Sequence, residues 1–262
     1  MKVTFLGTGT SQGVPVIACE CPVCLSIDFK DKRLRSAIHI ETGELSIVVD
    51  TGPDFRQQMI RERVKKLDAI LFTHEHKDHT AGLDDIRGFN FKQKGDIPIY
   101  GHQRVLDQLK REFSYIFAED KYPGGPRIEI NSIENKSFQV GSTSILPIEV
   151  MHYKLPVFGF RIGDFAYITD AKSISESEKN KLKGVSTLVL NALQKKPHIS
   201  HLTLEESLEL AKEINADHKK EAKEKKKKIA KEGFTKKSVF KEFISFIGNG
   251  FKLKENDQTG KS

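Results

Sequence analysis

The chain has no long hydrophobic run, which argues against a protein held in the membrane by apolar helices. No stretch of its 262 residues approaches the roughly 18 consecutive apolar residues of a membrane-spanning helix. The N-terminal segment MKVTFLGTGT predicts a short strand and a glycine turn, and it lacks the charged-then-apolar pattern of an export signal. We therefore expect a globular, cytoplasmic protein, and a hydrophobic content of 37% is sufficient for a proper core.

The chain also has few cysteines, and their number and positions exclude a disulfide framework. Cys19, Cys21 and Cys24 lie together in ACECPVC and there are no others, whereas a disulfide-stapled extracellular fold has an even, scattered set. Thiols spaced C-x-C-x-x-C favour a structural Zn²⁺ site in a reducing compartment, with a fourth ligand from elsewhere. The alternative is three inert thiols.

The positive charge is confined to one end of the chain. The net charge is +7, but the residues from 218 onward hold 14 lysines against 6 acids, or +8, so the first 217 residues sum to −1. This distribution predicts no nucleic-acid-binding face on the main body. We expect one globular domain over residues 1–217 and a lysine-rich, atypical tail over 218–262, where a block of like charge resists packing.

Short apolar runs alternate with helical patterns along the first 217 residues. Apolar residues recur at three-to-four spacing in segments 56–67, 103–117 and 203–214, and the last begins with Thr203 and Glu206 in capping-box spacing. The runs of strand length are Val3–Leu6, Ser46–Val49, Ala69–Phe72, Ile97–Tyr100, Ile145–Met151, Ala166–Thr169 and Thr187–Leu190. This alternation predicts an α/β protein in which helices cover the sheets.

Metal-ligating residue types are concentrated in LFTHEHKDH, at residues 71–79. His74 and His76 follow a buried strand, and two residues apart in extended backbone they point to the same side. Asp78 and His79 begin the next turn. Clustered imidazoles and a carboxylate suit a divalent ion such as Zn²⁺, whereas the alternative is a solvated polar loop.

Two further candidate ligands, His152 and Asp170, also lie just past the ends of expected strands. A side chain at that position leaves the sheet and can enter a pocket. A lone histidine or aspartate there is usually an ordinary loop residue. Their order behind the first cluster favours ligands here.

Several motifs of the chain resemble one known family. They are FLGTGTSQGVP (5–15), CECPVC (19–24), THEHKDH (73–79), VMHY (150–153), YITDA (167–171) and PHISHLTLEE (197–206). The chain resembles a metallo-β-lactamase-fold hydrolase, in the branch that includes phosphoribosyl 1,2-cyclic phosphate phosphodiesterase. The resemblance covers about residues 1–216 and implies a four-layer αββα sandwich.

The resemblance also implies a pair of active-site metal ions, Zn²⁺ or alternatively Mn²⁺. The first would be held by His74, His76 and His152, and the second by Asp78 and His79, with Asp170 bridging the pair. In such a site a shared hydroxide attacks phosphorus.

The resemblance also implies which residues contact the substrate, and the sequence offers candidates that support the metal ligands. Asp78 and His201 are assigned to catalysis. His201 matches a position that contacts substrate and would protonate the leaving oxygen. The alternative for His201 is a histidine in a surface turn. His198 is a weaker candidate for this role than His201. The TGTSQG loop lacks the lysine of a P-loop and is expected to line the pocket by its backbone. Asp50, Thr51 and Asp54 follow another strand, where an acid can orient a ligand histidine.

The chain departs from the family pattern near its C-terminus. Proteins of this branch carry a strand ending in T-H-x-S-H, whose histidines complete the second metal and the cysteine site. Here the only histidine after His201 is His218, followed by lysines. Both sites are thus expected to lack one ligand, and the final strand to be missing or altered. We therefore expect fewer than two Zn²⁺ bound at the active site.

A change of reading frame after Asp217 is one hypothesis for this departure. Finding no alternative frame that encodes T-H-x-S-H in the gene would reject it. A genuine but atypical tail is the alternative.

The leading functional hypothesis is a metal-dependent phosphodiesterase acting on small cyclic or nucleotide-like phosphate esters. One alternative is a tRNA 3′-end-processing endonuclease, which the near-neutral body disfavours. Another is a catalytically impaired remnant that lacks the last ligand. The expected partner is a small phosphate ester, with no membrane and no specific nucleic acid. Dimerisation is common in the branch, so a homodimer is also an expectation.

Overall fold

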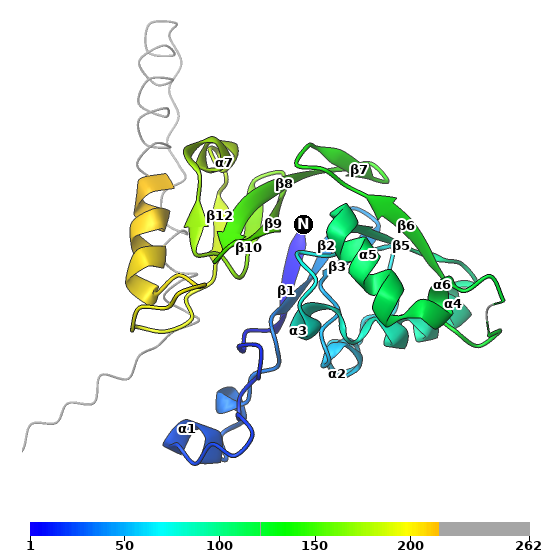
Figure 1. Cartoon of the computed structure of the whole chain (residues 1–262), viewed down its shortest axis with the longest axis horizontal. Coiled ribbons are helices and arrows are strands. Elements are labelled where there is room, and N and C mark those ends of the chain that lie inside the picture. Colours follow the sequence, from blue (N-terminus) through cyan, green and yellow to red (C-terminus); the bar gives the residue numbers. More distant parts are fainter. Residues whose placement is uncertain (121, 215–262) are drawn as a thin grey trace, which may run out of the picture.

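The computed structural model of the protein describes residues 1–120 and 122–214. In this part of the chain two six-stranded sheets lie face to face, and helices cover their outer faces (Figure 1). The layers are therefore helix, sheet, sheet and helix. The expected αββα sandwich is confirmed.

The first sheet contains the N-terminal half of the fold in the order β1-β2-β3-β4-β5-β6. The pairs β1–β2 and β2–β3 are antiparallel, whereas β3–β4, β4–β5 and β5–β6 are parallel. Its strands are β1 (Lys2–Gly7), β2 (Ala37–Thr42), β3 (Leu45–Val49), β4 (Ala69–Leu71), β5 (Ile97–Gly101) and β6 (Ile128–Ser132). The parallel strands bring the chain segments after β3 and β4 to one edge of the sheet.

The second sheet has the order β11-β8-β9-β10-β12, and β7 also pairs with β8. All its pairs are antiparallel except β10–β12, which is parallel. Its strands are β7 (Phe138–Val140), β8 (Thr143–His152), β9 (Leu155–Ile162), β10 (Phe165–Ile168), β11 (Ser173–Ile174) and β12 (Thr187–Leu190).

The outer layers consist of short helices. Beside the first sheet lie α2 (Phe55–Arg61), α3 (Lys77–Thr80), η2 (Leu83–Ile86), α4 (Arg87–Gln93), α5 (Gln103–Glu112) and α6 (Ser114–Phe117). Beside the second sheet lie α7 (Glu176–Lys181) and the helix over residues 204–214 (Figure 1). Separate from both, α1 (Pro22–Leu25) and η1 (Phe29–Asp31) belong to a protruding segment.

Both faces of the central strands are buried, which explains their continuous apolar sequences. In β10, Phe165 and Tyr167 belong to the core between the sheets, whereas Ala166 and Ile168 face the outer core with the 204–214 helix. A third core lies between the first sheet and its helices. The period of two along a strand thus divides each run between two cores.

The expected strands are confirmed, with ends that differ by one or two residues, but two expected helices are shorter. The helix expected over 56–67 ends at Arg61, because Arg63 adopts a left-handed backbone with φ 53°. The helix expected over 103–117 is interrupted at Phe113, where ψ is 42°. Five strands were not among the expected runs, namely β2, β6, β7, β9 and β11.

The third expected helix is confirmed together with its capping box. The Thr203 backbone N–H donates to Glu206 Oε2 at 2.7 Å, and the Glu206 N–H donates to Thr203 Oγ1 at 3.2 Å. The domain boundary at 217, the lysine-rich tail and the question of the final strand lie outside the described residues.

Candidate metal centre

The candidate site forms where several strands end at the same side of the sandwich. Asp50 follows β3, His74 follows β4, His152 ends β8 and Asp170 follows β10. Asp50 and Asp170 have left-handed backbones, with φ 67° and 53°, which aspartate tolerates better than most residues. These conformations turn the chain sharply as it leaves each sheet, and strain of this kind concentrates at functional sites.

Three histidines converge at this edge from two different sheets. His74 Nε2 lies 3.0 Å from His76 Nδ1, and the rings of His76 and His152 have centroids 5.2 Å apart. One ligand-type nitrogen from each residue lies within 4.8 Å of the others. His76 stands in extended backbone immediately before α3, so the segment from His74 to His76 presents both rings to one side.

A second group combines His74, His79 and Asp170, whose ligand-type atoms also lie within 4.8 Å of one another. His79 Nε2 is 2.6 Å from Asp170 Oδ2, and His74 Nε2 is 3.8 Å from the same oxygen. Asp78 lies alongside, with its Oδ2 3.2 Å from His79 Nε2. His74 therefore belongs to both groups.

Asp170 Oδ2 provides the test of whether a metal ion fits here. This oxygen is buried, and its one close polar contact is the ion pair with His79 Nε2 at 2.6 Å, which does not meet the geometric criteria of a hydrogen bond. A buried carboxylate oxygen without a hydrogen-bond donor is costly unless a cation compensates it. Imidazole nitrogens and carboxylates gathered around it are the ligand types that Zn²⁺ takes. The residues present fit one or two divalent ions.

Burial and neighbouring charges set the protonation of these ligands. Burial, aided by the charge of His79, lowers the pKa of His74 well below its usual value, which keeps its ring neutral. Burial alone would lower the pKa of His79 as well, but the carboxylates of Asp50 and Asp170 raise it well above the usual value. Burial alone would raise the pKa of Asp170, yet His79 holds it low. Ligation at His79 Nε2 therefore requires loss of a proton, so metal affinity depends on pH.

Asp50 supports the centre from behind. Its buried carboxylate lies 2.7 Å from His79 Nδ1 and accepts bonds from the Thr73 backbone N–H at 2.9 Å and the Thr73 hydroxyl at 2.8 Å. Thr73 Oγ1 is in turn 3.0 Å from His74 Nδ1. One carboxylate thus orients His79 directly and His74 through Thr73. Thr73 was missed in the sequence, because nothing in its spacing distinguishes it from a strand-end threonine.

We expect Asp50→Asn to weaken metal binding by about 10–100-fold, the usual effect of losing a supporting carboxylate. The amide keeps the shape of the side chain but offers His79 a weaker, uncharged acceptor. Calorimetric titration of chelator-treated protein with Zn²⁺ measures the change. Asp54→Asn is the matched control, because Asp54 pairs with Arg35 at 2.9 Å and takes no part in the metal centre. Equal affinities for Asp50→Asn and the unmodified protein would contradict the assignment.

The loop before the 204–214 helix adds two more histidines to the edge of the centre. His201 Nδ1 lies 3.2 Å from Asp170 Oδ1, and its ring centroid is 4.6 Å from that of His152. The His198 ring is 5.1 Å from His201. The same loop supplies the Ser200 carbonyl, 2.9 Å from His152 Nδ1, which fixes that ring. Ser200 is a further residue that sequence reasoning missed.

The other sequence candidates occupy supporting positions. Thr51 is buried and its backbone N–H donates to the His79 carbonyl at 2.8 Å, which fixes the turn that carries His79. Asp54 binds Arg35, whose Nε donates to the Ser11 carbonyl at 2.7 Å in the TGTSQG loop. These contacts hold the glycine loop against the body and do not add ligands.

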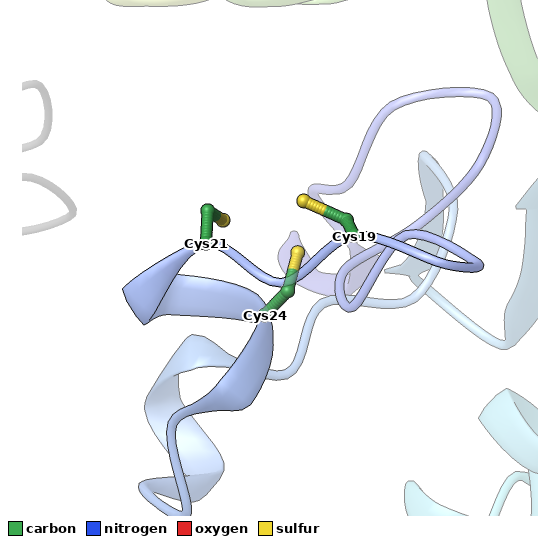
Figure 2. A group of neighbouring side chains, drawn as sticks. All are labelled: Cys19, Cys21 and Cys24. Atoms are coloured by element: carbon green, nitrogen blue, oxygen red, sulfur yellow. The ribbon is translucent and has the colours of Figure 1, made fainter.

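The three cysteines form a separate group on the protruding segment, with their sulfur atoms turned toward one another (Figure 2). Their Sγ atoms lie within 4.8 Å of each other. Hydrogen bonds from the Cys24 backbone and from neighbouring thiols lower the pKa of Cys21 to about 7. A thiolate available near neutral pH is the form that binds metal. Among the described residues no histidine, aspartate or glutamate joins this group as a fourth ligand.

An αββα sandwich with clustered histidines and aspartates at its edge defines a metallo-hydrolase. A family model described as a β-lactamase superfamily domain matches residues 46–220, and the chain belongs to this superfamily, as a metallo-β-lactamase-fold hydrolase. The fold implies binding of divalent metal.

Among solved structures, one described as a new diphosphatase from the PhnP family is 37% identical to this chain. The match covers 81% of this chain and 82% of that one, with a TM-score of 0.75. Zn²⁺-bound PqqB from Methylobacterium extorquens shares the fold, with 20% identity, a TM-score of 0.61, and coverage of 75% and 74%.

A curated relative from Porphyromonas gingivalis named octanoyltransferase is 39% identical over 212 residues, which are 80% of this chain and 43% of the relative. Ribonuclease Z from Staphylococcus epidermidis is 28% identical over 172 residues, 62% of this chain and 49% of the relative. The chain thus spans less than half the length of these curated relatives.

In the described part of the chain, no helix is long and apolar enough to cross a membrane. This agrees with the absence of long apolar runs from the sequence. The cytoplasmic location stays a prediction.

Proposed function

We propose that this protein is a metal-dependent phosphodiesterase that hydrolyses small cyclic or nucleotide-like phosphate esters. The observation that carries the proposal is the convergence of side chains in two groups that share His74, one with His76 and His152 and the other with His79 and Asp170. The 37% identity to a diphosphatase supports phosphorus chemistry. Zn²⁺ is the proposed ion, with Mn²⁺ as the alternative.

The proposed ligand roles follow the two groups of side chains. His74, His76 and His152 would hold one ion, Asp78 and His79 the other, and Asp170 would bridge them. The chemistry that such ions supply when bound is activation of a water molecule and neutralisation of charge on the phosphoryl oxygens. The side chains around them fix the positions of the ions and hold the phosphate for in-line attack.

His201 is the proposed proton donor to the leaving oxygen. Its Nδ1 faces Asp170 Oδ1 at 3.2 Å, so Nδ1 carries a proton toward that carboxylate and the ring is oriented by it. In the imidazolium form Nε2 carries the second proton, and this is the proton that would pass to the leaving oxygen. Burial lowers the pKa of His201, and Asp170 opposes that shift. A group of this kind gives up its proton readily as negative charge develops on the leaving oxygen. Asp78, next to His79, is the second residue assigned to catalysis.

The test compares phosphate substrates of three types in the presence of Zn²⁺ or Mn²⁺. These are bis(p-nitrophenyl) phosphate, a five-membered cyclic nucleotide phosphate and a nucleoside diphosphate. Turnover of the two diesters that is lost with a chelator and restored by metal supports the proposal. Faster cleavage of the diphosphate identifies a diphosphatase instead, which the 37% identical structure favours as the second candidate. No turnover with either metal would reject both.

Metal content provides an independent measurement. We propose that the chain as written holds fewer than two Zn²⁺ at the active site, since the sequence lacks the family's last histidine motif. Elemental analysis of a Cys19→Ser, Cys21→Ser, Cys24→Ser variant reports the active-site metal alone. The difference from the unmodified protein gives the metal held by the cysteines, for which we propose one structural Zn²⁺. Two tightly held ions in the triple variant would contradict the stoichiometry.

The dependence of tRNA binding on salt distinguishes a ribonuclease Z-like activity from hydrolysis of small phosphate esters. Binding of tRNA through phosphate contacts weakens steeply as salt rises, because counterions are released on association. A truncated chain ending at residue 217 lacks the segment with a charge of +8. Processing of tRNA 3′ ends by this truncated form would favour the endonuclease.

A further inference from the structure

The first group of histidines is assembled from both sheets, so its geometry depends on how the sheets meet at this edge. His74 and His76 follow β4 of the first sheet, whereas His152 ends β8 of the second. Their ligand-type nitrogens lie within 4.8 Å of one another. A metal site requires its ligands to be held within about 0.5 Å of their proper positions. Contacts that join the two sheets here therefore matter for metal affinity.

Arg104 contacts a segment of each sheet at this edge. It lies in the first turn of α5, and its Nε donates to Glu75 Oε1 at 2.7 Å. Its Nη2 donates to the Pro156 carbonyl oxygen at 2.6 Å. The Glu75 contact reaches the segment after β4, and the Pro156 contact reaches β9 of the second sheet. One guanidinium therefore binds both sheets, and we call this pair of contacts the Arg104 bridge.

Both acceptors of the Arg104 bridge are close in the chain to proposed metal ligands. Glu75 stands between His74 and His76, so a shift of its carboxylate is transmitted to the backbone of both. Pro156 lies on β9, across the two-residue turn of the β8–β9 hairpin from His152. The ring centroids of His76 and His152 are 5.2 Å apart. The bridge thus spans the boundary between the two segments that supply these rings.

Burial makes Glu75 dependent on this arrangement. Its side chain is 18% exposed and that of Arg104 is 33% exposed. Glu75 Oε2 is buried and has no hydrogen-bond partner among the residues that the structure describes. A mostly buried carboxylate with one hydrogen-bonded oxygen needs its counter-charge close by. Arginine suits this role because its planar guanidinium points several N–H groups in fixed directions, whereas the lysine ammonium is a point charge without that geometry.

The Arg104 bridge is not what holds the two sheets together. Close to it in the chain, the Phe158 backbone N–H donates to the Thr73 carbonyl at 3.0 Å. The apolar side chains between the sheets form a buried core of their own. These contacts do not involve Arg104, so they persist when it is replaced. The expected effect of its loss is therefore a displacement of the ligands at the edge, and not unfolding of the domain.

We propose that Arg104 is a positioning residue of the metal centre. Its two contacts, made at once, keep His76 and His152 at the separation that binding of one ion requires. Arg104 acts through Glu75 and the Pro156 carbonyl and holds no metal itself. The proposal rests on the ligand roles proposed above for the histidines, and it does not depend on which ester is hydrolysed. The alternative role for Arg104 is a direct contact with the substrate phosphate.

The test compares two neutralised ion pairs in the full-length chain. The first is Arg104→Met with Glu75→Gln, which removes the bridge without leaving a mostly buried carboxylate uncompensated. The matched control is Arg127→Met with Asp96→Asn. This pair, with Nε and Oδ1 3.3 Å apart, precedes β6 and β5 and so lies at the opposite edge of the first sheet from the metal centre. Arg104→Lys is the third variant, since it keeps the charge but not the planar group.

Two measurements report on the metal centre without requiring turnover. Equilibrium dialysis against graded concentrations of free Zn²⁺ measures the affinity, and the visible absorption of the Co²⁺-substituted protein reports the ligand geometry. The cysteine site is identical in every variant, so differences between their spectra come from the histidine centre. The midpoint of thermal unfolding, measured with chelator in all samples, reports the stability of the domain alone.

We expect the variant without the bridge to bind Zn²⁺ at the histidine centre about 10–100-fold more weakly, the usual effect of losing a group that orients a ligand. Its Co²⁺ spectrum should change, while its unfolding midpoint should match that of the control pair. The control pair should keep the affinity and the spectrum of the unmodified chain. Arg104→Lys should have an intermediate affinity, because the ammonium still compensates Glu75 but cannot hold both acceptors.

Unchanged Zn²⁺ affinity with an unchanged Co²⁺ spectrum would overturn the proposal. So would a weaker affinity with a spectrum of unchanged shape, which a merely destabilised domain would give. A raised KM for phosphodiesters, with affinity and spectrum unchanged, would show that Arg104 contacts the substrate instead. Full recovery of affinity and spectrum in Arg104→Lys would leave no role for the geometry of the guanidinium.

His76→Ala distinguishes failure of this proposal from failure of the metal centre itself. Its Co²⁺ spectrum should differ from that of the unmodified chain, because it lacks a proposed ligand. Identical spectra of His76→Ala and the unmodified chain would reject the proposed ligands and this inference together. A changed spectrum in His76→Ala but not in the variant without the bridge would reject the role of Arg104 alone.

Discussion

His76→Ala is expected to reduce kcat/KM for a phosphodiester by on the order of 10³-fold or more, which corresponds to about 4 kcal/mol of transition-state stabilisation. His76 lies between His74 and His152 in the first ligand group, with Nδ1 3.0 Å from His74 Nε2. Its removal takes away a proposed ligand without opening the core, because the ring is on the exposed side of the cluster. Steady-state kinetics with saturating metal measures the loss.

Two further measurements show that this loss reflects the metal centre. Zn²⁺ content should fall in His76→Ala, while the midpoint of thermal unfolding, measured with chelator present in both samples, should change little. His102→Asn is the matched control, because His102 is an exposed histidine outside the metal centre that caps α5, and asparagine is also a good cap. Activity that is similar in both variants would show that the histidine cluster does not carry the chemistry.

Gly52→Ala is expected to destabilise the fold by about 3 kcal/mol, at the upper end of the usual cost of overpacking. A Cβ at this position would lie 2.1 Å from the Asp78 carbonyl oxygen, a distance that no rearrangement of side chains relieves. The backbone of α3 must move, and Asp78 and His79 move with it. In a domain of this size the unfolding midpoint falls by roughly 6–12 °C.

The activity of Gly52→Ala should fall together with its stability, because a small displacement of the ligands disturbs the reacting geometry. Gly88→Ala is the matched control. Gly88 lies in the first turn of α4 with nothing within 4 Å of an added Cβ, so alanine there should be neutral or slightly stabilising. Thermal unfolding and steady-state kinetics of both variants measure the changes in stability and in activity. A Gly52→Ala variant as stable and active as Gly88→Ala would contradict the close contact between the β3 turn and α3.

Much of the fold was predictable because its central strands are buried on both faces and read as short apolar runs. Five strands were missed, and one of them, β9, has the sequence LPVFGFRI, which contains proline and glycine. The helix expected over 56–67 ended early at a left-handed Arg63, a backbone choice that periodicity does not record. The length of an amphipathic pattern therefore overestimates a helix when a left-handed residue ends the helix inside the pattern.

The candidate site was also predictable only in part. His74, His76, Asp78 and His79 are close in sequence, so their residue types and spacing were visible directly. The contact between Asp50 and His79 spans 29 residues, and the bond between His152 and the Ser200 carbonyl spans 48. Such pairs are defined only when separate strands end at a common edge.

The sequence by itself determined the class of fold, the superfamily and the residue types available to hold metal, because strand periodicity and motif spacing are local properties of a chain. The tertiary structure alone decided which carboxylate supports His79, which side chains surround Asp170, and which loop carbonyl orients His152. Burial, distance and electrostatic shifts depend on the packing of segments that are distant in sequence, so no local pattern contains them.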